Sequence, residues 1–155
     1  MKIIESNPID RPIRLAIVVS QFNEAVTGLL LEGAQARLAE HLLDSSQLTL
    51  VKVPGAIEIP LAARKLAEKN DMDAIVCLGA VIRGETSHYD YVCAHVNRGC
   101  AVVSEDFGLP VVFGVLTTEN QAQALARCGG DHGHMGQSSI DTALAMISVL
   151  DQIGT

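Results

Sequence analysis

The segment Asp73–Gly79, DAIVCLG, is a short apolar run that is typical of a strand buried on both faces of a sheet. Three other segments share its length and apolar character: Arg14–Ser20 (RLAIVVS), Leu48–Val53 (LTLVKV) and Pro110–Leu116 (PVVFGVL). Apolar residues at helical spacing occupy five further segments: Gly28–Leu43, Ile57–Lys69, Tyr89–Asp106, Thr118–Arg127 and Ser138–Ile153. Strands that alternate with helices form βαβ units, so the sequence predicts an α/β fold with a four-stranded parallel sheet covered on both faces.

Local signals refine this pattern at three places. Pro60 is expected in the first turn of a helix, where its missing N–H is tolerated. Thr118 followed by Gln121 is a capping-box signature, which predicts a helix start there. Residues 1–13 show no helical pattern and are interpreted as an N-terminal arm or an extra edge strand, which could pair with a neighbouring subunit. A chain of 155 residues is expected to form one domain.

The composition excludes several classes of protein. The chain carries 11 Lys and Arg against 18 Asp and Glu, a net charge of −7, which argues against nucleic acid or an anionic membrane as its partner. A hydrophobic fraction of 48% argues against disorder, and the 19% of charged residues suggests that a partner covers some surface. No apolar run approaches the ~20 residues of a membrane span. Four cysteines without a CxxC pair indicate free thiols in a reducing cytoplasm.

Ligands of an open parallel sheet bind beyond the carboxyl ends of its strands, and the richest of these ends is the stretch after the third strand, Gly79–His88. Thr86, Ser87 and His88 open a helix there, and the free N–H groups of a helix start favour an anion such as phosphate. The alternative is that Thr86 or Ser87 only caps the helix. No Walker A or GxGxxG pattern is present, so a nucleotide cofactor is unsupported. His88, beside this anion site, is the candidate proton carrier.

The other strand ends and one glycine-rich stretch hold further candidates. Phe22 follows the first strand between polar residues, which suggests stacking on a planar heterocycle. Glu58 either favours the dipole of its helix or accepts hydrogen bonds from a polyol or an amine. Cys128, His132 and His134 have only weak metal-ligand spacing, and a polar turn between helices is the favoured interpretation. His95 is interpreted as a packing or interface residue.

Three motifs together are similar to those of the 6,7-dimethyl-8-ribityllumazine synthase family. They are Val53–Ala67 (VPGAIEIPLAARKLA), Leu78–Val92 (LGAVIRGETSHYDYV) and Val112–Asn120 (VFGVLTTEN). The resemblance runs from about Arg14 to Ile153 in the right order and spacing, and it includes Phe22 and Asn23 after the first strand. It implies a flavodoxin-like three-layer α/β/α sandwich.

The resemblance also implies a reaction and an assembly. The family condenses 5-amino-6-(D-ribitylamino)uracil with 3,4-dihydroxy-2-butanone 4-phosphate and releases phosphate and water, without cofactor or metal. This is the penultimate step of riboflavin synthesis. Its members form pentameric rings and, in some cases, sixty-subunit shells.

Residue roles follow by the same resemblance. Phe22 would stack on the pyrimidine, and His88 would be the catalytic proton carrier. Phe113 and Arg127 would come from the adjacent subunit, with Arg127 on the phosphate. The remaining substrate-binding residues implied by the resemblance are Ala56, Ile57 and Glu58 for the ribityl chain and ring, Ala80, Val81 and Ile82 for the pyrimidine pocket, and Glu85 and Thr86 for the phosphate.

The sequence departs from the family pattern near the expected phosphate. Asp131 and Met135 replace two lysines, and Glu85 replaces a small residue. Arg127, Arg83, His132 and His134 are the remaining cationic candidates. We therefore expect weaker affinity for the phosphate substrate than in lysine-bearing relatives. The same departures leave a non-catalytic lumazine- or flavin-binding or shell-forming relative as the alternative, whereas a flavodoxin-like FMN carrier would have a Ser/Thr/Gly-rich first loop.

Overall fold

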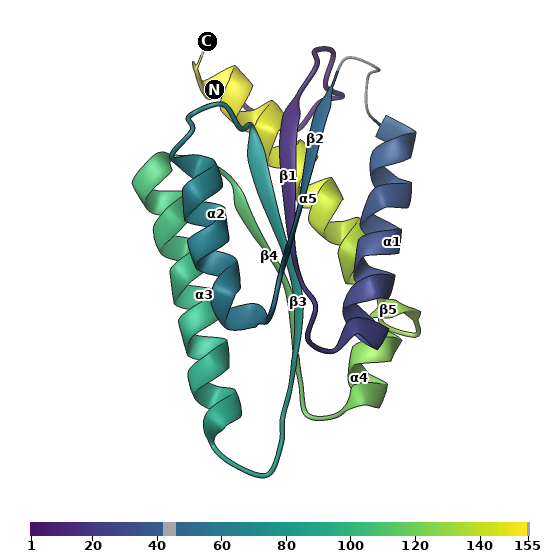
Figure 1. Ribbon diagram of the computed structural model, residues 1–155. Helices are drawn as coiled ribbons and strands as arrows, with labels where there is room; N and C mark the ends of the chain where they lie inside the picture. Colours follow the sequence, from purple (N-terminus) through teal and green to yellow (C-terminus); the bar gives the residue numbers. More distant parts are fainter. Residues whose placement is uncertain (42–45, 155) are drawn as a thin grey trace.

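The computed structural model describes residues 1–41 and 46–154 and contains the predicted sheet (Figure 1). Four parallel strands lie in the order β2-β1-β3-β4. Their bounds are Arg14–Ser20 for β1, Gln47–Val53 for β2, Ala74–Ile82 for β3 and Val111–Thr118 for β4. The chain thus passes from the central β1 to the edge β2 and then crosses to β3 on the other side of β1. That reversal is a topological switch point, where open α/β sheets bind ligands.

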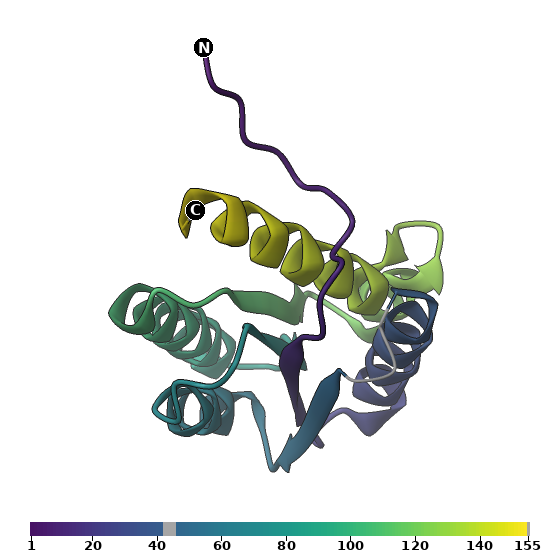
Figure 2. The ribbon, with the colours of Figure 1, turned by 90° about the horizontal axis from the view of Figure 1, so that it is seen from above.

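Helices cover both faces of the sheet and confirm the α/β/α sandwich (Figure 2). On one side α1 (Glu24–His41) packs against α5 (Met135–Gly154), and on the other α2 (Ile59–Ala67) packs against α3 (His88–Phe107). A short α4 (Gln121–Ala126) follows β4. The predicted helix Gly28–Leu43 begins earlier than expected, at Glu24, and its last two residues, Leu42 and Leu43, lie outside the described residues.

The two faces of β1 supply two separate cores, because successive side chains of a strand point in opposite directions. Leu15, Ile17 and Val19 pack into the cluster under α1 and α5. Ala16 and Val18 pack into the cluster under α2 and α3. This double burial explains why the strand is a continuous apolar run rather than an alternating one.

Two strands, β3 and β4, end later than the sequence suggested, and this corrects two expectations. β3 runs on to Ile82, paired with Thr118, so Ala80, Val81 and Ile82 belong to a strand rather than to a loop. Thr118 consequently ends β4 and does not cap a helix. The cap of α4 is Asn120, whose side-chain oxygen accepts a hydrogen bond of 2.9 Å from the Gln123 N–H.

The turn after β2 also differs slightly from expectation. The predicted helix at Ile57–Lys69 begins as a single 3₁₀ turn, η1 (Ala56–Glu58), and continues as α2 from Ile59. Pro60 lies in the first turn of α2, as predicted.

Residues 1–13 form no helix or strand in this chain, so they are an arm rather than an edge strand of its own sheet. The first residues project away from the body in Figure 2. The Asn7 N–H then donates to Ser148 Oγ on α5 at 2.9 Å, and Arg11 pairs with Asp73 and Asp151, both at 2.9 Å. Across the part of the chain that the structure describes, no helix has the length and apolar character needed to cross a bilayer.

The glycine-rich stretch after α4 forms a small hairpin rather than an irregular turn. Strand β5 (Cys128–Gly130) pairs antiparallel with β6 (Gly133–His134). Gly129 and Gly133 have φ of 98° and 78°, values that favour glycine. The hairpin packs beside α1 and leads directly into α5.

Candidate functional site

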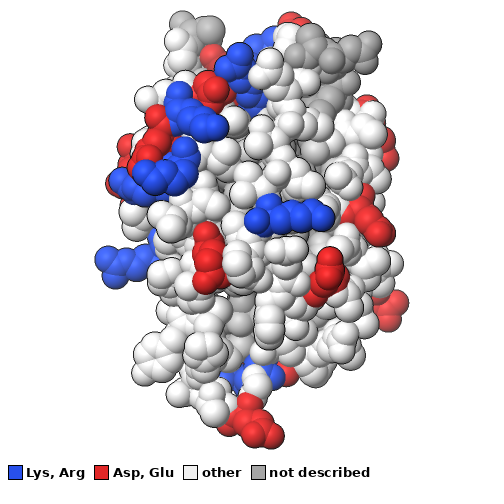
Figure 3. Space-filling view, viewed as in Figure 1, with Lys and Arg blue, Asp and Glu red and all other residues white. Residues whose placement is uncertain are grey.

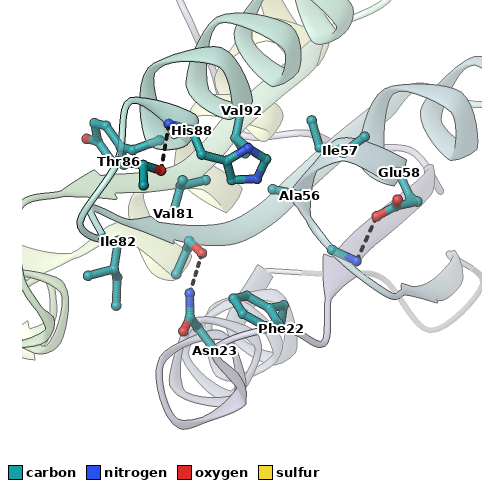
Figure 4. A pocket seen from close by; sticks show the side chains of 14 residues that line it. Phe22, Asn23, Ala56, Ile57, Glu58, Val81, Ile82, Thr86, His88 and Val92 are labelled. Atoms are coloured by element: carbon teal, nitrogen blue, oxygen red, sulfur yellow. Dashed lines mark hydrogen bonds between the residues drawn. The ribbon is translucent and has the colours of Figure 1, made fainter.

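A cavity of about 320 Å³ opens at the carboxyl ends of the strands, at the switch point (Figure 4). Its walls come from the turn after β1, from η1, from the end of β3 and from the start of α3. The lining residues are Phe22, Asn23, Gly55, Ala56, Ile57, Glu58, Ala80, Val81, Ile82, Gly84, Thr86, His88, Tyr89 and Val92. The predicted site residues from these segments are therefore neighbours, except Glu85, which does not line the cavity.

The turn after β1 is fixed to both neighbouring strands. The Phe22 N–H donates to the carbonyl of Pro54 at 2.9 Å, and Asn23 Nδ2 donates to the carbonyl of Ala80 at 2.9 Å. Asn23 has a φ of 62°, a left-handed conformation that asparagine tolerates better than most residues. The Phe22 side chain stays 73% exposed, so its ring is available for stacking on a ligand.

Glu58 is oriented by its own helix turn. Its Oε2 accepts a hydrogen bond of 2.9 Å from the Gly55 N–H, the reciprocal bond of a capping box (Figure 4). An ionised carboxylate has more acceptor sites than this one bond uses. The exposed carboxylate beside the cavity can therefore accept hydrogen bonds from hydroxyl or amine groups of a ligand.

The end of β3 and the first helical turn of α3 form the apolar wall. Ala80 and Val81 are buried, Ile82 is half-buried, and Val92 lies one turn after His88 on the same face of α3. Such a wall suits the faces of a planar ring, while the polar groups at its rim orient the ligand.

The loop between β3 and α3 presents His88 to the cavity (Figure 4). His88 is the first residue of α3, its side chain is exposed, and its N–H donates to Thr86 Oγ1 at 3.3 Å. Thr86 therefore performs a capping role as well as lining the cavity, while the Ser87 hydroxyl makes no capping bond. Within the described residues, the amide N–H groups of Glu85 and Thr86 donate no hydrogen bond, so they are free to bind an anion.

Two predicted site residues, Phe113 and Arg127, lie away from this cavity. Phe113 is half-buried on β4 and lines a separate groove of about 440 Å³ that Met135 also lines. Arg127 follows α4, and its Nη1 donates to the carbonyl of Gln123 at 2.8 Å. Their contribution to a neighbouring subunit's site stays a prediction.

Arg83, expected as a cation for the phosphate, is engaged elsewhere. Its Nε donates to Glu119 at 2.6 Å, and its other nitrogens face Asp90 at 3.3 and 3.5 Å. These hydrogen bonds, first Glu119 and then Asp90, raise the pKa of Arg83. Arg83 is not among the residues that line the cavity.

Cys128 and His134, two residues of the weak metal-ligand pattern around the hairpin, make separate contacts. Cys128 Sγ lies 3.3 Å from the carbonyl of Ala124, and the His134 ring packs over Gly33 of α1. Burial raises the pKa of the Cys128 thiol. In residues 1–41 and 46–154 no group of three or more His, Cys, Asp or Glu side chains is placed to hold a metal ion. His95 is exposed on α3, outside the cavity lining.

Sequence reasoning left five lining residues without a role: Asn23, Gly55, Gly84, Tyr89 and Val92. Signals for two of them were present. Val92 is four residues after His88, so helical geometry places both on one face. An asparagine directly after a strand end is a candidate for a left-handed turn residue.

An open α/β sandwich with an apolar cavity and a polar rim at its switch point defines a protein with a cavity suited to a small molecule. The family model for 6,7-dimethyl-8-ribityllumazine synthase matches residues 12–151. Two curated relatives of that name, from Coxiella burnetii strains Dugway and Nine Mile, are 52% and 51% identical over 140 residues, which cover 90% of this chain and 93% of each relative. This chain belongs to the 6,7-dimethyl-8-ribityllumazine synthase family.

Proposed function

We propose that this chain is a transferase that condenses 5-amino-6-(D-ribitylamino)uracil with 3,4-dihydroxy-2-butanone 4-phosphate to 6,7-dimethyl-8-ribityllumazine, the penultimate step of riboflavin synthesis. The observation that carries the proposal is the meeting of Phe22, Glu58 and His88 around one cavity, although they come from three distant segments. The aromatic face of Phe22 suits a pyrimidine, and the fixed carboxylate of Glu58 suits a ribityl chain. The imidazole of His88 suits a proton transfer.

The cavity divides into regions of different chemistry. Phe22 stacks on the pyrimidine, and the apolar wall from Ala80 to Ile82 packs on the ring. Glu58 accepts hydrogen bonds from ribityl hydroxyls, with Ala56 and Ile57 holding the chain and ring.

The phosphate binds at the start of α3. The free amide N–H groups of Glu85 and Thr86 supply donors there, and the helix dipole favours an anion. Arg127 of an adjacent subunit adds the positive charge that Arg83, paired with Glu119, does not supply. Phe113 from the same neighbour closes the cavity.

Catalysis then consists of holding two substrates together and moving protons. The amine adds to the ketone with loss of one water, phosphate is eliminated, and the ring closes with loss of a second water. Proximity in one cavity can supply effective molarities of ~10⁵ M or more. Proton transfer by His88 is expected to add ~10²–10⁴-fold.

We further propose that the functional unit is a homo-oligomer in the cytoplasm, a pentameric ring alone or within a sixty-subunit shell. Each chain is one domain, and the first residues of its arm, which project from the body in Figure 2, pack on a neighbour. Exposed Leu48 and Leu50 on the edge strand β2 support an interface, because such edges are otherwise prone to aggregate. Much of the face in Figure 3 carries no charge, which also supports coverage by a partner. All four cysteines are free thiols, as in a reducing compartment.

Turnover of the purified chain tests the reaction. Mixed with both substrates, it should produce lumazine fluorescence and release phosphate faster than the same mixture without protein. Binding of lumazine without its formation would contradict the proposal and identify a non-catalytic binder.

A further inference from the structure

The loop that precedes His88 is held by few contacts. Residues 83–87 join β3 to α3 without regular structure and are exposed, and Gly84 has no atom near the place of a side chain. Apart from the contacts of Arg83 and the hydrogen bonds of Thr86 and Ser87 with the first turn of α3, this loop contributes little packing that would fix the imidazole-bearing helix start against the sheet. An imidazole that transfers protons must nevertheless be held to within a fraction of an ångström.

One side chain, Arg83, connects the pieces around this loop. Its backbone N–H donates to the carbonyl of Thr118 at 2.9 Å, which anchors the loop's beginning to β4. Its guanidinium reaches Glu119 on the β4–α4 connection at 2.6 Å and Asp90 in the first turn of α3. The same guanidinium lies 4.3 Å above the ring of Tyr89, which lines the cavity.

From this arrangement we propose that Arg83 is a positioning residue: it ties the first turn of α3 to the end of β4 and so holds His88 at the reacting atoms. The inference rests on the proton-carrying role proposed for His88. The planar guanidinium is suited to this task, because it bridges two carboxylates and stacks on an aromatic ring at once, which a lysine ammonium cannot do.

Isolated surface ion pairs contribute little to global stability, so the effect is local. The chain offers a matched control in Arg64 of α2, which pairs with the other end of α3. Arg64 pairs with Asp106 at 2.9 Å and lies 5.3 Å from the Phe107 ring, and its side chain is 41% exposed against 36% for Arg83. It makes the same kinds of contact but lies outside the cavity lining.

The test compares Arg83→Ala, Arg83→Lys and Arg64→Ala in the condensation assay and in titrations with lumazine. We expect Arg83→Ala to lower kcat about tenfold, Arg83→Lys to recover only part of it, and Arg64→Ala to stay within about twofold. The dissociation constant of lumazine should change less than about threefold, since the strand-borne walls remain. Glu119→Gln, which leaves Arg83 in place, should lower kcat in the same direction and serves if Arg83→Ala does not fold.

A double variant separates positioning from other roles. If Arg83 acts through His88, adding Arg83→Ala to the His88→Ala variant should lower its kcat by no more than about twofold. A further tenfold loss of kcat in the double variant would overturn the inference. An unchanged kcat with a raised KM for the phosphate substrate in Arg83→Ala alone would also overturn it, because that result would mean direct contact with phosphate. If His88→Ala by itself left kcat unchanged, the role proposed for His88 would be refuted instead.

Discussion

The ring of His134 fills the space over Gly33 that a side chain on α1 would need. Any methyl group at Gly33 would overlap that ring, and one at Gly136 would overlap the carbonyl of Leu30. The 128–134 hairpin and the start of α5 can therefore approach α1 closely only because the two points of contact are glycines, Gly33 on α1 and Gly136 on α5.

Gly33→Ala should lower the free energy of unfolding by about 1–3 kcal/mol, because the added methyl group overpacks the contact with His134. Urea denaturation measures the change. Gly28→Ala is the matched control: it lies on the same helix with no atom within 4 Å of its Cβ position, and it should be neutral or stabilising. Failure of His134→Ala to rescue Gly33→Ala would contradict the assigned contact.

The turn at Asn23 should respond differently to two small substitutions. Asn23→Gly loses the bond to Ala80 but keeps the φ of 62°, whereas Asn23→Ala also adds strain of about 1 kcal/mol. We expect lumazine to bind more weakly to both variants, and most weakly to Asn23→Ala. Fluorescence titration measures this, and an order in which glycine is the worse of the two would contradict the account.

The sheet could be predicted because each strand is a short apolar run and both its faces are buried. The cavity could be predicted because parallel strands end at one edge, which brings Phe22 and His88 together. The extension of β3 to Ile82 could not, since Gly79 looked like a strand end and the pairing partner, Thr118, is remote in sequence. That ladder also removed Thr118 from its expected capping role.

Other features lacked any local signal. The strands β5 and β6 have three and two residues, too short for a periodic pattern. The contact of His134 with Gly33 joins residues about a hundred positions apart, and no spacing in the sequence predicts it. The hydrogen bond of Arg83 with Glu119 likewise depends on how the ends of β3 and β4 lie next to each other.

The arm should make the chain sensitive to acid through Asp151. Hydrogen bonds from Arg11 lower the pKa of the Asp151 carboxyl below its ordinary value. A group with a lowered folded pKa adds stability above its unfolded pKa of ~3.9, and this is lost as the pH falls through the folded pKa. Arg11→Met should therefore melt lower than the unsubstituted chain at pH 7, with the gap closing below about pH 4. A gap that is constant down to pH 2 would contradict the pairing.

Asp131 should weaken binding of the phosphate substrate, because it is an exposed carboxylate in the hairpin, four residues after Arg127. Asp131→Lys, alone and with Met135→Lys, is expected to lower KM for the phosphate substrate about threefold to tenfold, and added salt should reduce the gain. Asp131→Asn, which only removes the charge, should give a smaller gain. A KM that does not fall in the double-lysine variant would contradict the expectation. Met135 packs partly against the core, so its substitution also costs stability.

The steady-state rate of lumazine formation by His88→Ala tests the central claim most directly. The account predicts that kcat falls about 10²-fold while both KM values change little, and that the residual rate stays well above that of the substrates alone. This is the result expected if a shared cavity does most of the work and one imidazole carries the protons. An unchanged kcat, or a rate no faster than the uncatalysed mixture, would contradict it.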